Sequence, residues 1–194
     1  MTRRISAFFY SLRRGRVALA STVIFFVFTA TALPAQARKS ETYAAGGPTP
    51  DTSLFYSADD IYAWASAFGP DGRDQYVQAR YTFDLVWPLI YTLLLVAVIT
   101  WLLGTFLKPG DKWRRLNLVP FAPLLLDYAE NISASIVITR YPATTPVLAD
   151  VVTVFTTAKW VTLSASFALL VVIAVVAFVR RGTRKSLTTK KEAV

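Results

Sequence analysis

The chain has 194 residues, of which 54% are hydrophobic, and it contains neither histidine nor cysteine. The apolar residues gather in runs of about 20, the length that crosses a membrane, which favours a membrane protein over a soluble one. Disulfides are excluded, and so are catalytic and metal sites that depend on an imidazole or a thiol. No metal site or cofactor is predicted.

The formal net charge of +9 is spread unevenly. Basic residues gather before the first apolar run, between the second and third runs, and after the last. Because positive residues mark the cytoplasmic side, this pattern predicts a membrane protein with both termini cytoplasmic if the first run is retained. Such clusters bind anionic lipid headgroups, and we expect no nucleic-acid partner. The clusters are Arg3, Arg4, Arg13, Arg14 and Arg16; Lys108, Lys112, Arg114 and Arg115; and Arg180, Arg181, Arg184, Lys185, Lys190 and Lys191.

The first apolar run, residues 17–35, follows a basic arm, residues 1–16, and two interpretations of it stay open. Leu33-Pro34-Ala35-Gln36-Ala37 ends in the small-x-small pattern of a cleaved signal peptide. Alternatively, the run is a retained transmembrane helix near the lower length limit of about 17 residues. The protein then has four transmembrane helices, and otherwise three.

Residues 36–80 form the predicted outer loop, which contains one short amphipathic helix, 57–68. Ser57 with Asp60 three residues later is typical of a helix N-cap. The Gly-Pro-Asp-Gly sequence at 69–72 is expected to end the helix. Its aromatic residues suit the membrane surface.

The predicted membrane core, residues 81–179, has helices at about 81–106, 116–140 and 148–179. The short turn at 108–112 makes the first two of these antiparallel neighbours. Residues 180–194 form a basic cytoplasmic tail. The predicted fold is therefore an all-α membrane protein, an antiparallel bundle of transmembrane helices.

The helix at 116–140 carries ionisable residues within its apolar sequence. Asp127, Glu130 and Asn131 share one helical face, and each acid costs roughly 2.5 to 3.5 kcal/mol at the centre of a membrane. That face is expected to point into the bundle, a cavity or a ligand. Hydroxyl groups predicted at similar depth would donate hydrogen bonds to the acids. The candidate binding or relay residues are Asp127, Glu130, Asn131, Tyr91, Thr92 and Ser166.

A depth count separates these acids from other charged residues. At about 1.5 Å per residue, Glu130 is expected at mid-membrane, whereas Asp84 and Lys159 are both expected near the outer rim. An outer-rim ion pair of Asp84 with Lys159 is the favoured prediction. Arg80 and Arg140 are alternative partners for Asp84.

Several short motifs resemble a family of bacterial four-span integral membrane proteins of unknown function. They are Tyr56-Ser57, Gly69-Pro70-Asp71-Gly72-Arg73 with Tyr76, Asp84 to Pro88 with Tyr91, and Asp127 with Glu130-Asn131. The resemblance implies a location in the inner membrane and implies no reaction.

Three functions are compatible with this pattern. The favoured one is a binding or scaffold protein whose cavity holds a lipid or an apolar small molecule beside Glu130. The second is a small proton- or cation-coupled transporter that uses Asp127 and Glu130, which would require a homo-oligomer because the chain has few helices. The third is an intramembrane lipid-modifying enzyme with the paired carboxyls as acid and base, although an enzyme is the less expected class.

Overall fold

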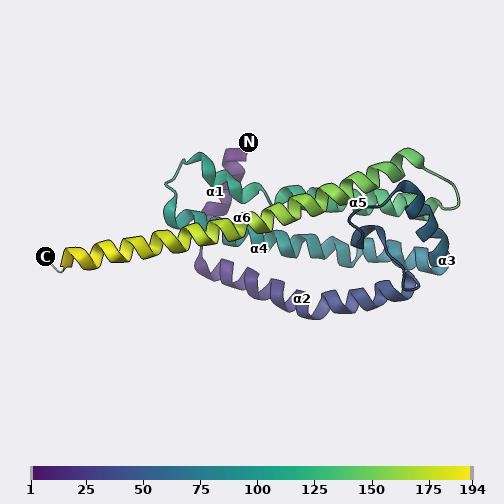
Figure 1. Cartoon of the computed structure of the whole chain (residues 1–194), viewed down its shortest axis with the longest axis horizontal. Helices are drawn as coiled ribbons and strands as arrows, with labels where there is room; N and C mark the ends of the chain where they lie inside the picture. Colours follow the sequence, from purple (N-terminus) through teal and green to yellow (C-terminus); the bar gives the residue numbers. More distant parts are fainter. Residues whose placement is uncertain (1, 193–194) are drawn as a thin grey trace.

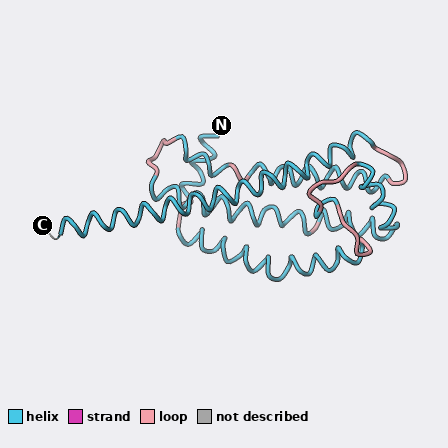
Figure 2. Tube along the Cα trace, viewed as in Figure 1, coloured by secondary structure: helices cyan, strands magenta, loops and turns pink. Residues whose placement is uncertain are grey.

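The computed structural model describes the backbone of residues 2–192 and the side chains of residues 2–181. It is 85% helical, and the described range contains no strand (Figure 2), which confirms the all-α class. The helices are α1 (Thr2–Ser11), α2 (Gly15–Tyr43), η1 (Pro50–Thr52), α3 (Ala58–Tyr81), α4 (Phe83–Phe106), η2 (Lys112–Leu118), α5 (Phe121–Arg140) and α6 (Pro146–Glu192).

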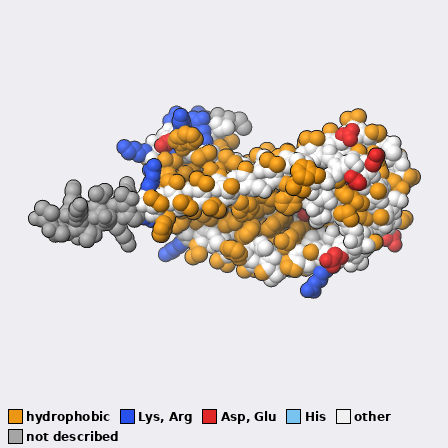
Figure 3. Space-filling view, in the orientation of Figure 1, with side chains coloured by type: hydrophobic (Ala, Val, Ile, Leu, Met, Phe, Trp, Pro, Cys, Tyr) orange, Lys and Arg blue, Asp and Glu red, His pale blue; other side chains and the backbone are white. Residues whose placement is uncertain are grey.

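Four helical segments are long and apolar enough to cross a membrane: 15–43, 58–106, 112–140 and 146–181. In Figure 1 the long helices α2, α4, α5 and α6 lie lengthwise beside one another. Figure 3 shows most of the lysine and arginine side chains near the end that carries α1, most of the acidic side chains near the other end, and a largely hydrophobic surface between them. These features are those of a multi-pass membrane protein.

Helix α3 begins where the capping motif predicts but continues further. The Ser57 hydroxyl accepts the backbone N–H of Asp60, and the Asp60 carboxylate accepts the backbone N–H of Ser57 at 2.7 Å. Gly69 interrupts the helix with a φ of 65°, a conformation that favours glycine. Pro70 then suits the first turn of a new helix, because its φ is preset and its missing N–H is not needed there. The helix capped by Ser57 thus breaks at Gly69, next to the predicted end at residue 68, and a second helical segment that was not predicted runs from Pro70 to Tyr81.

The N-terminal arm forms helix α1, which packs on the short helix η2. The Ser6 hydroxyl contacts the Asn117 side-chain oxygen at 2.9 Å, and the Asn117 amide donates to the Thr100 hydroxyl at 3.1 Å. The Phe9 ring lies 5.7 Å from the Phe121 ring. These contacts connect α1, η2, α4 and α5 at one end of the molecule.

Two apolar clusters form the interior. One gathers side chains of α3, α5 and α6, including Ile61, Tyr76 and Val137. The other joins α4 to the second half of α6. The buried charged residues contact both clusters, because the Arg80 guanidinium stacks on the Tyr76 ring of the first and Asp127 accepts a hydrogen bond from Tyr91 of the second.

Candidate functional site

The acidic face of α5 is buried inside the protein. Asp127, Glu130 and Asn131 are 6%, 1% and 4% exposed, and their spacing of three and four residues places them on one face of the helix. The Asn131 amide donates to the Asp127 carboxylate at 3.2 Å and to the backbone carbonyl oxygen of Asp84 at 3.4 Å. The Tyr91 hydroxyl donates to the other Asp127 oxygen at 3.1 Å. Helices α4 and α5 therefore meet through a small polar network.

The other two predicted hydroxyl groups lie elsewhere. Thr92 lines a separate apolar cavity at the α1 end of the bundle. The Ser166 hydroxyl donates to the backbone carbonyl of Thr162, on its own helix, at 2.7 Å. Of the predicted hydroxyl donors, Tyr91 is the one that contacts an acid in the described part of the chain.

The predicted ion pair of Asp84 with Lys159 is not formed. The Lys159 ammonium instead lies 2.5 Å from the Glu130 carboxylate, and both side chains are almost completely buried. Asp84 pairs with Arg80 at 2.8 Å, which is the alternative partner that the sequence suggested. The depth count was therefore wrong for α5.

The error in depth arises at the start of the third span. The count set Leu116 level with Lys108, but the next residue, Asn117, bonds to Thr100 instead. Thr100 lies about 10 Å further along α4 than the count placed Asn117, at 1.5 Å per residue, so every residue of α5 sits about two turns further toward the α3 end of the molecule. Asn131 thus reaches the level of Asp84, and Glu130 reaches the level of Lys159.

Arg80 has a second carboxylate partner that sequence reasoning missed. Asp51, in the one-turn helix η1 after Pro50, lies 2.9 Å from the guanidinium of Arg80. Burial raises the pKa of Asp51, but the positive charges of Arg80 and Lys159 and the hydrogen bond from Thr49 together outweigh burial and lower the pKa below its usual range. The segment between α2 and α3 thus supplies a charged residue to the site. No local pattern marks Asp51, because only the folded loop brings it to Arg80.

The ionisable groups of this region form one cluster with more acids than bases. The charged cluster comprises Asp51, Asp84, Asp127, Glu130, Arg80 and Lys159. With every group ionised, four carboxylates face two cations, an excess of two negative charges. Such an excess in a buried site favours a positively charged ligand or proton uptake.

A cavity of about 180 Å³ opens between this cluster and helices α2 and α6. We call it the charged cavity; its lining includes Asp51, Arg80, Asp84, Asp127 and Lys159 together with Gln36, Trp87 and Trp160. Among the described residues, the side-chain nitrogens of Gln36 and Trp160 have no hydrogen-bond partner although both atoms are buried. Such donors cost free energy when they are left unpaired, and the cavity is large enough for several waters or a small polar group.

Helix α2 contributes residues to the cavity wall that were not predicted to lie there. Its residues Leu33, Gln36 and Ala37 line the charged cavity, and they lie within the possible signal-peptidase motif. The available signal was a glutamine directly after the apolar run 17–35. Comparisons with known proteins find no match, whether with family models, with curated protein sequences or with solved structures.

Proposed function

We propose that the protein is a bacterial inner-membrane binding protein whose charged cavity holds the polar head of a small amphipathic molecule. In this arrangement α2, α4, α5 and α6 form an antiparallel bundle with both termini cytoplasmic, and the first part of α3 lies at the outer membrane surface. The positive-inside pattern supports this orientation. The charged cavity then lies in the outer half of the membrane.

The observation that carries the proposal is the chemistry of the cavity wall. Charged side chains from η1, α3, α4, α5 and α6 converge on one cavity, where the acids outnumber the bases. A ligand with an amine or other cationic group would offset that excess, and its oxygen atoms would accept from Gln36 and Trp160. Trp87 and Leu163 add an apolar side for the start of a hydrocarbon tail. The cavity is smaller than the 300–1,000 Å³ typical of sites for drug-sized ligands, which suits a headgroup.

Native mass spectrometry of the detergent-purified protein tests this proposal. We expect a small-molecule adduct on the wild type that is lost in Gln36→Leu, which removes an unpaired donor without breaking an ion pair. Thr31→Val serves as the matched control on the same helix, because the Thr31 hydroxyl bonds only within α2, to the Val27 carbonyl. A wild type without any adduct, or an adduct that survives in a folded Gln36→Leu protein, would count against the proposal.

A second function, proton- or cation-coupled transport, is favoured by the excess of carboxylates. Asp127 is the natural relay residue, since it lines the cavity and is paired with neutral groups only. Liposome flux that is present in the wild type and lost in Asp127→Asn would support transport. Equal flux in both proteins would remove Asp127 from such a role.

A further inference from the structure

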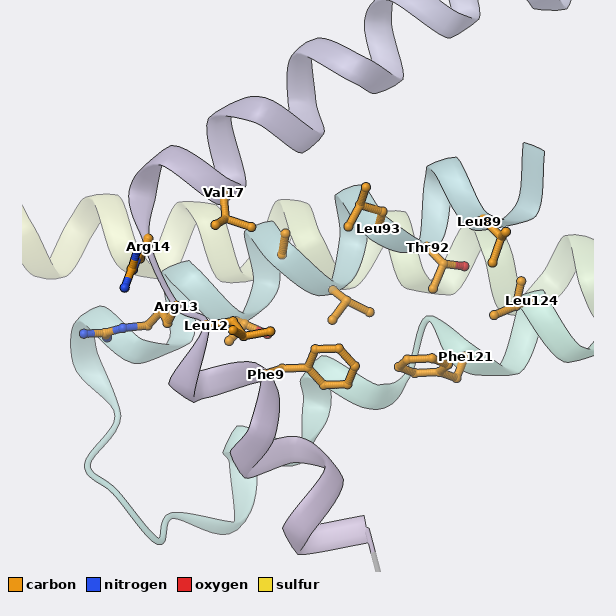
Figure 4. Close-up of a pocket in the computed structure, with 13 residues that line it drawn as sticks. Phe9, Leu12, Arg13, Arg14, Val17, Leu89, Thr92, Leu93, Phe121 and Leu124 are labelled. Carbon is orange, nitrogen blue, oxygen red and sulfur yellow. The ribbon is translucent and has the colours of Figure 1, made fainter. Parts of the chain in front are cut away.

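A second cavity lies at the α1 end of the bundle, away from the charged cavity. Its volume is about 460 Å³, which falls in the range of ligand sites, roughly 300–1,000 Å³. It runs between α1, the start of α2, and helices α4 and α5 (Figure 4). We call it the apolar groove; its main lining residues are Phe9, Leu12, Leu89, Leu93, Phe121 and Leu124.

The groove is built by packing within the protein and is not merely a gap between two helices. Phe9 of α1 contacts Phe121 of α5, and Ser6 holds α1 to η2 through Asn117. On the opposite wall, Leu89 and Leu93 of α4 remain 50% and 45% exposed. The groove therefore has a fixed floor and a side that opens toward the surrounding lipid.

One end of the groove is positively charged. Arg13 and Arg14 belong to its lining, and Figure 4 shows both at the end opposite Leu89 and Leu124. The Arg13 guanidinium donates to the backbone carbonyl of Gly104, which holds it at this end of α4. An anionic group seated here would meet both arginines, because guanidinium is a preferred partner of phosphate.

The length of the groove matches one leaflet of a membrane. Thr100 and Leu89 line it on α4, and at 1.5 Å per residue they are about 16 Å apart. The hydrocarbon core is about 30 Å thick, so this distance spans roughly one half of it. The charged end lies on the side that the basic clusters assign to the cytoplasm.

We propose that the apolar groove binds an anionic phospholipid of the cytoplasmic leaflet, with one acyl chain along Leu89, Leu93 and Phe121 and the phosphate at Arg13 and Arg14. Charge complementarity selects this occupant over a second copy of the chain, which would bring the same positive charge to the site. The lipid would fasten α1 to the bundle. This site is separate from the charged cavity, and neither proposal depends on the other.

Titration of delipidated protein with phosphatidylglycerol or phosphatidylcholine of identical acyl chains, read by native mass spectrometry, tests the proposal. We expect phosphatidylglycerol to bind more tightly, and Arg14→Gln to weaken it about fivefold, the effect of one basic residue at an anionic membrane surface. Ala97→Phe, which fills the groove and leaves its charge unchanged, should abolish the one-lipid adduct. The double variant Arg3→Gln/Arg4→Gln is the control, because it removes two charges from α1 that do not line the groove.

Three outcomes would overturn the proposal. Equal binding of the two lipids would show that the arginines do not select an anionic headgroup over a zwitterionic one. An equal or larger loss in the Arg3/Arg4 control than in Arg14→Gln would show general attraction to a basic surface. A wild-type dimer that Ala97→Phe makes monomeric would identify a second copy as the occupant. Circular dichroism of each variant keeps loss of binding distinct from loss of folding, and Arg14→Gln decides the test if Ala97→Phe does not fold.

Discussion

Replacing Lys159 by methionine leaves the Glu130 carboxylate buried without its cation. The two side chains lie 2.5 Å apart, and the residues are 5% and 1% exposed. Breaking a buried pair from one side costs about 3–5 kcal/mol, whereas replacing both partners with uncharged groups is often neutral. We therefore expect Lys159→Met to lose about 3–5 kcal/mol of unfolding free energy, and Lys159→Met/Glu130→Gln to regain most of that loss.

The assay is denaturant unfolding in mixed micelles, followed by the helical circular dichroism signal. It compares the wild type with Lys159→Met, with Glu130→Gln and with the double variant. Lys108→Met is the matched control, because Lys108 is exposed on the turn after α4, and it should stay within about 0.5 kcal/mol of the wild type. The reasoning is refuted if Lys159→Met costs less than about 1 kcal/mol, or if the losses of the two single variants simply add in the double variant.

Three further predictions concern the end of the molecule that carries α3. Ser57→Ala removes the N-cap of α3 and should lower the unfolding free energy by about 1 kcal/mol. An unchanged unfolding free energy in the same assay would show that the cap does not stabilise the protein. The pKa of Asp51 is lowered in the folded protein. The wild type should therefore be more stable than Asp51→Asn above a pH of about 4, and this difference in unfolding free energy should disappear as the pH falls further. A difference that grows on acidification would contradict the prediction. Gly72→Ala would place a Cβ 2.7 Å from the Tyr43 carbonyl oxygen, so we expect a lower melting temperature, and an unchanged one would show that α2 shifts freely.

Hydropathy and charge were sufficient to predict the all-α membrane class, because a run of apolar residues crosses a bilayer wherever it occurs. The polar face of α5 could also be recognised, since the spacing of Asp127, Glu130 and Asn131 is a local property of one helix. Local sequence likewise marked Ser57 as the start of α3. It did not show that Pro70 restarts the helix after Gly69, because a Gly-Pro pair is typical both of a stop and of a kink.

The pairing of charges could not be predicted, because it depends on how helices are staggered. One contact, Asn117 with Thr100, places α5 about 10 Å further along α4 than a count that sets Leu116 level with Lys108. Glu130 thereby gains Lys159, the partner that the count assigned to Asp84. Asp51 was missed for a related reason, since its role depends on the path of a loop. Gln36 was visible in the sequence, but its neighbourhood matched a cleavage motif.

Helix α2 differs from its neighbours in how it is held, and this difference suggests a route into the charged cavity. In a helix of 29 residues, only Ala18, Ser21 and Tyr43 are buried, and ring contacts such as Phe28 on Trp87 join its middle to α4. Pro34 removes a backbone hydrogen bond of α2 beside the cavity wall, so bending the helix at Pro34 breaks few further hydrogen bonds. Under the proposed function, an amphipathic molecule dissolved in the bilayer would enter the charged cavity sideways, head first, as α2 bends at Pro34 while Tyr43 stays packed on Phe68 and Tyr76.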